Sequence, residues 1–220
     1  MTTLITGASR GIGFAMAVQL AARGERVVAL NRTASPELAT RGVQVRDGIE
    51  LTDVEGVAAL AAGFVPGSLD RIIANAGLRI EDDFADFRLD DLRRQFEVNA
   101  LAPLNLVRAL APALKDGGKV ALISTRVGSL ADNGRGGEFG YRMSKAALNM
   151  AGVNLAHALK PRGIGVFLLH PGFVRTDLTG GQGLIDAAES AAKLIAMTDD
   201  LTIAETGSFW HAIERTRLPW

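Results

Sequence analysis

The stretch Thr6-Gly7-Ala8-Ser9-Arg10-Gly11-Ile12-Gly13 decides the fold of this chain. A short buried strand is predicted before it, over residues 2–6, and an apolar helix after it, over residues 14–22 and closed by Gly24. The glycines suit a tight turn in which the backbone comes close to a ligand. The start of the helix offers free N–H groups and the positive end of its dipole to an anion such as a pyrophosphate. The spacing Gly-x-x-x-Gly-x-Gly differs from the common Gly-x-Gly-x-x-Gly pattern, but the strand–loop–helix context predicts a nucleotide site.

Predicted strands and helices alternate from this unit to the end of the chain. Further strands are expected over residues 26–30, 43–49, 69–74, 119–124, 164–169 and 207–211, and helices after Ser35-Pro36 and over residues 53–62, 89–114, 146–159 and 186–197. Pro103 is expected to disturb the longest helix. This alternation predicts an α/β fold: a single-domain, doubly wound (Rossmann) parallel sheet of about seven strands, with helices on both faces, over residues 1–220.

The composition limits the kinds of function that the chain can have. Apolar residues make up 48% of the 220 residues, so a sizeable core can form. Lys plus Arg and Asp plus Glu number 24 each, a balance that offers nucleic acid no electrostatic footprint. The chain has no cysteine and only three histidines, so disulfide chemistry is excluded and we expect no metal site. With no signal peptide and no membrane-length apolar run in view, a cytoplasmic protein without membrane or nucleic-acid partners is expected.

The second informative stretch is Tyr141-Arg142-Met143-Ser144-Lys145. On a helix, residues four apart lie on one face, so the only tyrosine of the chain would have a lysine one turn away. A free phenol has a pKa of about 10, too high for acid–base work near neutrality. A neighbouring ammonium favours the phenolate, and lowering the pKa by roughly 2–3 units takes about 3–4 kcal/mol. Taken alone, the same spacing also fits a solvated lysine beside a half-buried tyrosine.

Polar and glycine-rich segments follow the predicted strands at one end only. They cover residues 7–13, 31–33, 75–77, 125–138 and 170–183. In a doubly wound sheet, ligands bind at the carboxyl ends of the strands, near the point where the strand order reverses. We therefore expect the functional site at this edge, with the last two segments long enough to close over a substrate.

These motifs occur in an order that resembles the short-chain dehydrogenase/reductase family. The family pattern is matched by Thr6-Gly7-x-x-x-Gly11-Ile12-Gly13, Asn75-Ala76-Gly77, Asn99, Tyr141-x-x-x-Lys145 and Pro171-Gly172. Within the family, the chain resembles the C-factor and sniffer-like carbonyl reductases, on Gly128-Ser129, Asn133, Gly136-Gly137, Tyr141-Arg142 and Leu218-Pro219-Trp220. The resemblance covers nearly the whole chain.

The resemblance implies a role for each matching residue. A ketone that accepts hydride becomes an alkoxide and needs a proton, which Tyr141 would donate. Lys145 would lower the tyrosine pKa and hold the nicotinamide ribose hydroxyls, and Asn99 would hold a water that links Lys145 to solvent. Thr176 would bind the nicotinamide amide. The implied cofactor contacts are Gly7, Ser9, Arg10, Gly11, Ile12, Gly13, Asn31, Arg32, Glu50, Leu51, Asn75, Ala76, Gly77, Tyr141, Lys145, Pro171, Gly172, Val174 and Thr176.

Several of these residues also have simpler structural interpretations. Asn99 could bond local backbone and bend its helix, and Thr176 could cap a helix. Asn75 could stabilise the central sheet, line the cofactor site or serve as a turn residue. His170, alone at the end of an apolar strand, fits a structural role better than a functional one.

One position departs from the family pattern. The family places a serine after the fifth strand to hold the substrate carbonyl, and here the pair reads Ser124-Thr125. The segment from this pair to Tyr141 also looks longer than is common. The resemblance favours Thr125 as the carbonyl-binding residue, with Ser129 and Ser124 as alternatives.

The end of the second strand indicates the cofactor. Proteins that use NAD usually place a carboxylate there, whereas a nearby arginine accommodates the 2′-phosphate of NADP. This chain has Asn31-Arg32 and no carboxylate until Glu37, and Ser9 and Arg10 could contact the same phosphate. NADP(H) is therefore predicted in preference to NAD(H), with Glu50-Leu51 beside the adenine.

The combined prediction is NADPH-dependent reduction of a small ketone, aldehyde or quinone. The alternatives are a nucleotide-binding signalling or redox-sensor protein of the C-factor type and an NAD-dependent alcohol dehydrogenase. A homodimer is expected, because the helix after Tyr141 is apolar nearly all round and a two-fold partner would cover it. The substrate is not defined, since the segment 178–184 is short and rich in glycine.

Overall fold

The computed structural model describes residues 1–220, and its centre is one eight-stranded sheet of order β3-β2-β1-β4-β5-β6-β7-β8. The strands are β1 (Thr2–Thr6), β2 (Arg26–Leu30), β3 (Gln44–Arg46), β4 (Leu69–Ala74), β5 (Leu114–Ile123), β6 (Gly165–His170), β7 (Ser208–His211) and β8 (Thr216–Arg217). Neighbours pair in parallel except β8, which is antiparallel to β7. The order reverses beside β1, because β2 and β4 lie on its two sides. The predicted Rossmann sheet is confirmed, with one strand more than expected.

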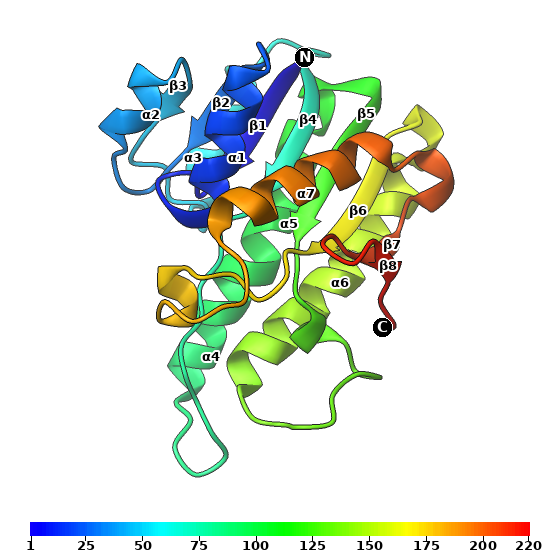
Figure 1. Ribbon diagram of the computed structural model, residues 1–220. Coiled ribbons are helices and arrows are strands. Elements are labelled where there is room, and N and C mark those ends of the chain that lie inside the picture. The colour runs from blue at the N-terminus through cyan, green and yellow to red at the C-terminus, as the bar shows by residue number, and fades with distance from the viewer.

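Helices cover both faces of this sheet (Figure 1). They are α1 (Gly11–Ala22), α2 (Pro36–Thr40), α3 (Val54–Ala62), α4 (Leu89–Phe96), α5 (Ala102–Leu110), α6 (Phe139–Leu159) and α7 (Ala187–Asp200). Successive strand residues point to opposite faces. In β1, Leu4 accordingly joins the core beneath α3, α5 and α6, and Ile5 joins the core beneath α1 and α7. The strands read as continuous apolar runs because both their faces are buried.

The predicted helix over residues 89–114 is not continuous. It divides into α4, a π-helical turn (Glu97–Leu101) and α5, and a 3-10 turn at 111–113 then leads into β5. Pro103 lies at the start of α5 and has no N–H to donate to the preceding turn, which explains the change of hydrogen-bonding pattern before it. Pro112 ends the helical segment, and β5 begins at Leu114, five residues earlier than predicted, because Leu114 pairs with Leu69.

The two edge strands of the sheet, β3 and β8, also differ from the prediction. The third strand is limited to three residues, and β8 was not predicted. Two residues carry no periodic signal, and β8 is defined only by its pairing, in which Trp210 lies opposite Arg217. The Arg217 guanidinium lies 5.1 Å from the Trp210 ring centre, a cation–π contact that supports this pairing.

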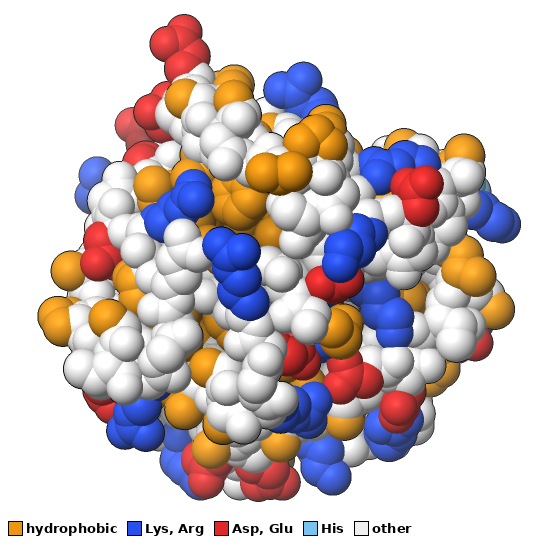
Figure 2. All heavy atoms as spheres, turned by 90° about the horizontal axis from the view of Figure 1, so that it is seen from above, with side chains coloured by type: hydrophobic (Ala, Val, Ile, Leu, Met, Phe, Trp, Pro, Cys, Tyr) orange, Lys and Arg blue, Asp and Glu red, His pale blue; other side chains and the backbone are white.

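The segments after β4, β5 and β6 leave the sheet at the same end, away from the N-terminus (Figure 1). Seen from the N-terminal side, the surface has Lys and Arg interspersed with Asp and Glu (Figure 2). None of the helices combines the length and apolar character needed to cross a membrane. Because the segments after β4, β5 and β6 leave the sheet at one end, the polar residues predicted to form a site there are gathered at its carboxyl edge.

Candidate functional site

The glycine loop between β1 and α1 has a shape that only glycine permits. Gly7 and Gly11 have φ values of +65° and +58°, in the left-handed region. A Cβ atom on Gly13 would lie 2.3 Å from the carbonyl oxygen of Gly7, and one on Gly7 would lie 2.8 Å from the Cα of Ala76. No side chain caps the N-terminus of α1. Its free N–H groups and dipole thus remain open to an anion.

Three polar side chains hold this loop in place. Asn75 donates from Nδ2 to the carbonyl oxygens of Thr6 and Gly7, at 3.2 and 3.1 Å. The Thr6 hydroxyl accepts from the N–H groups of Asn75 and Ala76, both at 3.1 Å. Asn75 therefore ties the glycine loop to the end of β4, and its contact with the cofactor stays a prediction.

Asn31 at the end of β2 does the same from the other side. Its Oδ1 accepts from the N–H of Ala8 at 2.9 Å, and its side chain is almost fully buried. We predicted a cofactor contact for this residue. The amide fixes the loop that would hold the cofactor, and the cofactor contact of Asn31 stays a prediction.

Beyond Asn31, a hollow of about 460 Å³ lies where the adenosine of a dinucleotide is expected. Its lining residues are Arg32, Glu50, Thr52, Arg94, Glu97 and Val98. The Arg32 and Arg94 guanidinium groups have no hydrogen bond or ion pair within the chain, whereas Arg93 pairs with Asp90 at 2.8 Å. Leu51 packs against the core below. The hollow offers two unpaired cations, Arg32 and Arg94, and two carboxylates, Glu50 and Glu97. The cations fit a phosphate, and a carboxylate fits the amino group of adenine.

Lys145 lies beneath the opposite end of the site, buried on α6. Its Nζ donates to the carbonyl oxygen of Ile123 at 2.9 Å, and no carboxylate pairs with it. The same Nζ lies 6.0 Å from the centre of the Tyr141 ring. The expected pair is thus brought together on one face of α6, and a Cβ on Gly77 would lie 3.7 Å from the ammonium.

Asn99 joins this group from the π-helical turn. Its Nδ2 donates to the carbonyl oxygen of Leu78 at 2.7 Å and to the Ser144 hydroxyl at 3.0 Å, and its Oδ1 accepts from the N–H of Leu78 at 2.7 Å. The backbone it binds is 21 residues away and not local. Asn99 therefore ties the segment after β4 to α6, where the Ser144 hydroxyl in turn donates to the carbonyl oxygen of Tyr141.

Burial dominates the electrostatics of this group. It raises the pKa of Tyr141 to about 12 and lowers the pKa of Lys145 to about 8. The charges that act on the tyrosine besides burial are those of Arg79, which lowers its pKa, and Glu138, which raises it. Lys145 is not among these charges, and its lowering of the tyrosine pKa stays a prediction.

The three candidate hydroxyls after β5 differ in what they bind. Ser124 donates from Oγ to Oδ1 of Asn149 at 2.6 Å and is buried against α6. Thr125 accepts from the N–H of Val127 at 3.4 Å, and its own proton has no acceptor in the chain. Both residues are buried, but the Ser124 hydroxyl is used in a side-chain hydrogen bond and the Thr125 proton is not.

Ser129 lies further along the same segment. Its Oγ accepts from the N–H of Asp132 at 3.1 Å and is nearly fully buried. Ser124 is thus the least suited of the three to bind the substrate carbonyl, because its proton is already donated to Asn149. Thr125 and Ser129 both keep a proton to donate.

The segment after β6 crosses the glycine loop. A Cβ on Gly11 would lie 3.4 Å from Cγ2 of Thr176, and Arg10 pairs with Asp177 at 3.0 Å, with both side chains exposed. Earlier in the segment, Gly172 has φ +85°. The structure therefore places Thr176 beside the N-terminus of α1. Arg10 pairs with Asp177, and its contact with the cofactor phosphate stays a prediction.

The start of the same segment is anchored to the body of the protein. The carbonyl oxygen of Pro171 accepts from the Ser190 hydroxyl at 2.8 Å, and buried Val174 forms a parallel bridge with Ile185. His170 stays neutral, since burial lowers its pKa to about 3, and its ring lies 4.6 Å from that of His211. No group of three or more His, Asp or Glu side chains is arranged to hold a metal ion.

Sequence reasoning missed several residues at this edge. Arg94 reaches the adenosine hollow from α4, and Arg79, Asp82 and Glu138 surround the N-terminus of α6. None belongs to a motif, and no spacing in the chain links residue 79 with residue 138. Only the fold brings them together.

Comparison with known proteins places the chain in a family. A family model described as short chain dehydrogenase matches residues 1–184. The chain is 41% identical to 1-hydroxy-2-glutathionyl-2-methyl-3-butene dehydrogenase of Rhodococcus sp. (strain AD45), covering 100% of this chain and 99% of the relative. It is 38% identical to C-signal of Myxococcus xanthus, covering 74% of this chain and 99% of the relative.

Solved structures agree with these relatives. The carbonyl reductase Sniffer of D. melanogaster superposes with a TM-score of 0.92 at 25% identity, covering 100% of this chain and 99% of the other. The NADPH-bound carbonyl reductase from chicken fatty liver has a TM-score of 0.89 at 28% identity, covering 100% and 98%.

The chain therefore belongs to the short-chain dehydrogenase/reductase family and is an oxidoreductase of that family. The resemblance to C-factor and sniffer-like proteins is confirmed. A nicotinamide cofactor fits the residues present, because the glycine cradle and the open helix terminus match a pyrophosphate, and the adjoining hollow matches an adenosine.

Proposed function

We propose that this protein reduces a small ketone, aldehyde or quinone with NADPH, and that Tyr141 donates the proton. The observation that carries the proposal is the buried Tyr141–Lys145–Asn99 group, which lies beside a glycine loop shaped for a dinucleotide. Burying an ammonium without a carboxylate partner is costly, and such arrangements are typical of sites that move protons.

When bound, the cofactor supplies a hydride to the carbonyl carbon. The chain's own residues then handle charge and protons. The Thr125 hydroxyl, which has a free proton, donates a hydrogen bond to the carbonyl oxygen as negative charge develops there. Tyr141 gives its phenolic proton to that oxygen, which completes the alcohol and leaves a phenolate. The Lys145 ammonium stabilises the phenolate, and Asn99 holds the helix start that carries both residues.

The preference for NADPH rests on the arginines at the adenosine end. Arg32 and Arg94 are unpaired and line the same hollow, where a 2′-phosphate would extend from the ribose. Glu50 and Leu51 flank the adenine, and Ser9, Gly11, Ile12 and Gly13 contact the pyrophosphate. Thr176, Val174, Gly172 and Pro171 receive the nicotinamide. Reduction is accordingly the physiological direction.

The test is consumption of NADPH, followed by the loss of reduced-nicotinamide absorbance, with a panel of small aldehydes, ketones and quinones. Wild-type protein is expected to turn over at least one class, with NADH giving a lower kcat/KM. The matched control is Tyr141→Phe, which keeps the aromatic ring and lacks the proton. If wild type and control consume NADPH equally slowly while both bind it, the protein is not a carbonyl reductase.

Two relatives favour a second test. The Rhodococcus relative is named a dehydrogenase of a hydroxy compound with a glutathionyl group, so the reverse reaction with NAD and glutathione-conjugated alcohols belongs in the panel. The second relative, C-signal, is named for a signal and not for a reaction. If this protein acts by signalling alone, its signalling activity should persist in Tyr141→Phe. Loss of that signalling activity in the variant would show that it depends on catalysis and not on binding alone.

We further propose that the protein forms a homodimer through α5 and α6. Leu101, the last residue of the π-helical turn before α5, is 49% exposed, and Met143 and Met150 on α6 are 49% and 61% exposed. A two-fold partner that presents the same helices would cover them. Light scattering is expected to give twice the monomer mass at micromolar concentration, and Met150→Glu is expected to return the monomer.

A further inference from the structure

The residue that precedes α6 has a backbone conformation that needs an explanation. Glu138 has φ +48° and ψ +50°, and it is one of only two non-glycine residues with positive φ. This left-handed conformation costs on the order of 1 kcal/mol for a residue with a Cβ. The two residues before it are glycines that also have positive φ. A third glycine would be the unstrained choice, so the carboxylate at this position has a use.

That use is not capping of the helix. The N-terminus of α6 is capped by Asp82, which accepts from the N–H groups of Phe139 and Gly140 at 2.5 and 2.9 Å. The Glu138 side chain forms no cap hydrogen bond. Its carboxylate is free to bind elsewhere.

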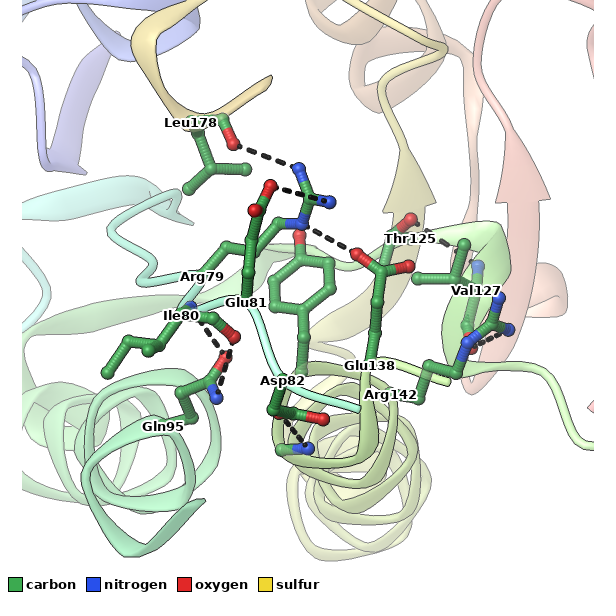
Figure 3. A network of polar contacts seen from close by, with 12 residues as sticks. Arg79, Ile80, Glu81, Asp82, Gln95, Thr125, Val127, Glu138, Arg142 and Leu178 are labelled. Atoms are coloured by element: carbon green, nitrogen blue, oxygen red, sulfur yellow. Dashed lines mark hydrogen bonds and ion pairs between the residues drawn. The ribbon is translucent and has the colours of Figure 1, made fainter. Parts of the chain in front are cut away.

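The carboxylate binds Arg79, at the centre of Figure 3. Nε of Arg79 donates to Oε1 of Glu138 at 2.7 Å, a charge-assisted hydrogen bond. The same guanidinium donates to the carbonyl oxygen of Leu178 at 3.4 Å and lies 3.6 Å from the exposed Glu81 carboxylate. Arg79 thus links the segments after β4 and β6 to the start of α6. The side chains of Arg79 and Glu138 are 25% and 30% exposed, so solvent screens the pair only partly.

The pair lies next to the reactive tyrosine. Tyr141 follows Glu138 by three residues, which is about one helical turn. The other charged groups near this end of α6 are Arg142 and Lys145 on the helix, Glu81 and Asp82 after β4, the Arg126–Asp132 pair after β5 and the Arg10–Asp177 pair after β6. Among all of these, Arg79 and Glu138 are the two whose charges change the pKa of Tyr141, in opposite directions.

We propose that Arg79 and Glu138 are positioning residues of the catalytic centre: their ion pair sets how readily Tyr141 releases its proton. This proposal rests on the proposed role of Tyr141 as proton donor. The guanidinium is held by both the Glu138 carboxylate and the carbonyl oxygen of Leu178, so Arg79 keeps its place when the carboxylate is removed. The Arg79 charge stabilises the phenolate, and the Glu138 charge opposes it. The strained backbone at Glu138 is retained because it directs the carboxylate to Arg79.

The chain allows a direct test, because Tyr141 is its only tyrosine. Protein labelled with ¹³Cζ-tyrosine gives one NMR signal that reports the ionisation of this residue, with or without a substrate. The titration is followed on the NADP⁺-loaded protein for wild type, Arg79→Gln and Glu138→Gln. Loss of Arg79 is expected to move the midpoint to higher pH, and loss of the Glu138 carboxylate to lower pH, each by about half a pH unit or more.

Two matched variants separate charge from structure. Glu81→Gln removes a carboxylate that also faces Arg79 but is 86% exposed, and it is expected to leave the midpoint unchanged. Arg79→Lys keeps the charge and is expected to restore most of the wild-type midpoint. Tyr141→Phe removes the signal and confirms its assignment.

A role in folding alone would lower the melting temperature in Arg79→Gln and Glu138→Gln without moving the two midpoints in opposite directions. Shifts in the same direction, or no shift, overturn the proposal. If Arg79→Gln does not fold, Glu138→Gln decides alone, and a midpoint that rises or stays constant overturns it. Because no turnover is measured, the two failures are distinguishable: opposite shifts in a protein that reduces no carbonyl would keep the effect of the ion pair on Tyr141 and reject only the proposed reaction.

Discussion

The two ends of the sheet bury a cation in different ways. At the amino end, Arg71 is fully buried between two carboxylates, Glu25 at 3.5 Å and Asp199 at 3.0 Å. At the carboxyl end, Lys145 is nearly as buried, but its only partner is the carbonyl oxygen of Ile123. The first cation is neutralised by its neighbours. The second is not, and burial lowers its pKa to about 8.

This difference distinguishes structural charge from functional charge. A buried cation that is paired with carboxylates holds elements together, and here Arg71 links β4 to α7 and to the residue before β2. A buried cation that lacks a counter-ion weakens the fold, and it persists where its charge acts on a reactive group.

The largest expected effect belongs to the carboxyl end. Tyr141→Phe is expected to lower turnover of any carbonyl substrate by about 10³-fold, since proton transfer from a positioned side chain contributes on the order of 10²–10⁴-fold. The phenyl ring still fills the buried space, so the melting temperature and NADPH affinity should stay close to wild type. Turnover and cofactor titration are measured on the same preparation. Retention of more than a tenth of the wild-type rate would contradict the assigned role.

At the carboxyl end of the sheet, the sequence predicted the residues that belong to motifs better than the residues that surround them. The glycine loop, Asn75, Asn99, Tyr141 and Lys145 belong to motifs whose spacing reflects a turn, a sheet edge or one helical face. These constraints are local or shared by a family, so a sequence can show them.

Contacts between distant segments left no such signal. The pairing of residue 79 with residue 138 depends on how the segments pack, and so does the presence of residues 32 and 94 at one hollow. Likewise, β8 exists only through pairing, and the π-helical turn at 97–101 results from Pro103 and the packing around Asn99. Asn31 stood at a predicted contact position, but its direction into the loop followed from burial.

The second prediction compares the two buried cations directly. Arg71→Met leaves Glu25 and Asp199 without their partner and should cost about 3–5 kcal/mol of unfolding free energy, with little change in kcat of the folded fraction. Lys145→Met relieves a burial penalty of about 3 kcal/mol at neutral pH and forfeits one hydrogen bond of about 1–2 kcal/mol. It should therefore stabilise the fold by about 1 kcal/mol while abolishing activity. Denaturant unfolding measures both free energies.

The Lys145 effect has a definite pH dependence. The folded pKa of about 8 lies below the ordinary value of 10.5, so the unfolded chain binds more protons between these values. Wild-type stability then rises with pH in that window relative to Lys145→Met. The advantage of the variant at pH 7 should vanish near pH 10. Equal stabilities at both pH values would show that the ammonium is not buried as described.

The third prediction concerns the hydroxyl that faces the substrate. Thr125→Val keeps the shape of the side chain and removes the donor, and the loss of a hydrogen bond to developing negative charge typically costs about 10²–10³ in turnover. Ser129→Ala is the comparison within the same segment and should stay within a few-fold of wild type. Steady-state kinetics with one substrate measures both. The reverse pattern would assign the carbonyl contact to Ser129.

The smallest expected effect lies at the adenosine end. Arg32 and Arg94 there lack a carboxylate partner, as Lys145 does, but they are exposed to solvent. Isothermal titration should show NADPH binding at least about tenfold more tightly than NADH, or about 1.4 kcal/mol. Arg32→Asp should reverse the order, because a carboxylate there repels the 2′-phosphate and accepts from the ribose hydroxyls. Arg94→Gln should reduce the preference, whereas Arg93→Gln, whose guanidinium pairs with Asp90, should leave it unchanged. Equal affinities of wild type for the two cofactors would refute the preference. If wild type prefers NADPH but Arg94→Gln and Arg93→Gln show the same preference for NADPH over NADH, Arg32 alone binds the 2′-phosphate, and Arg94 only lines the hollow.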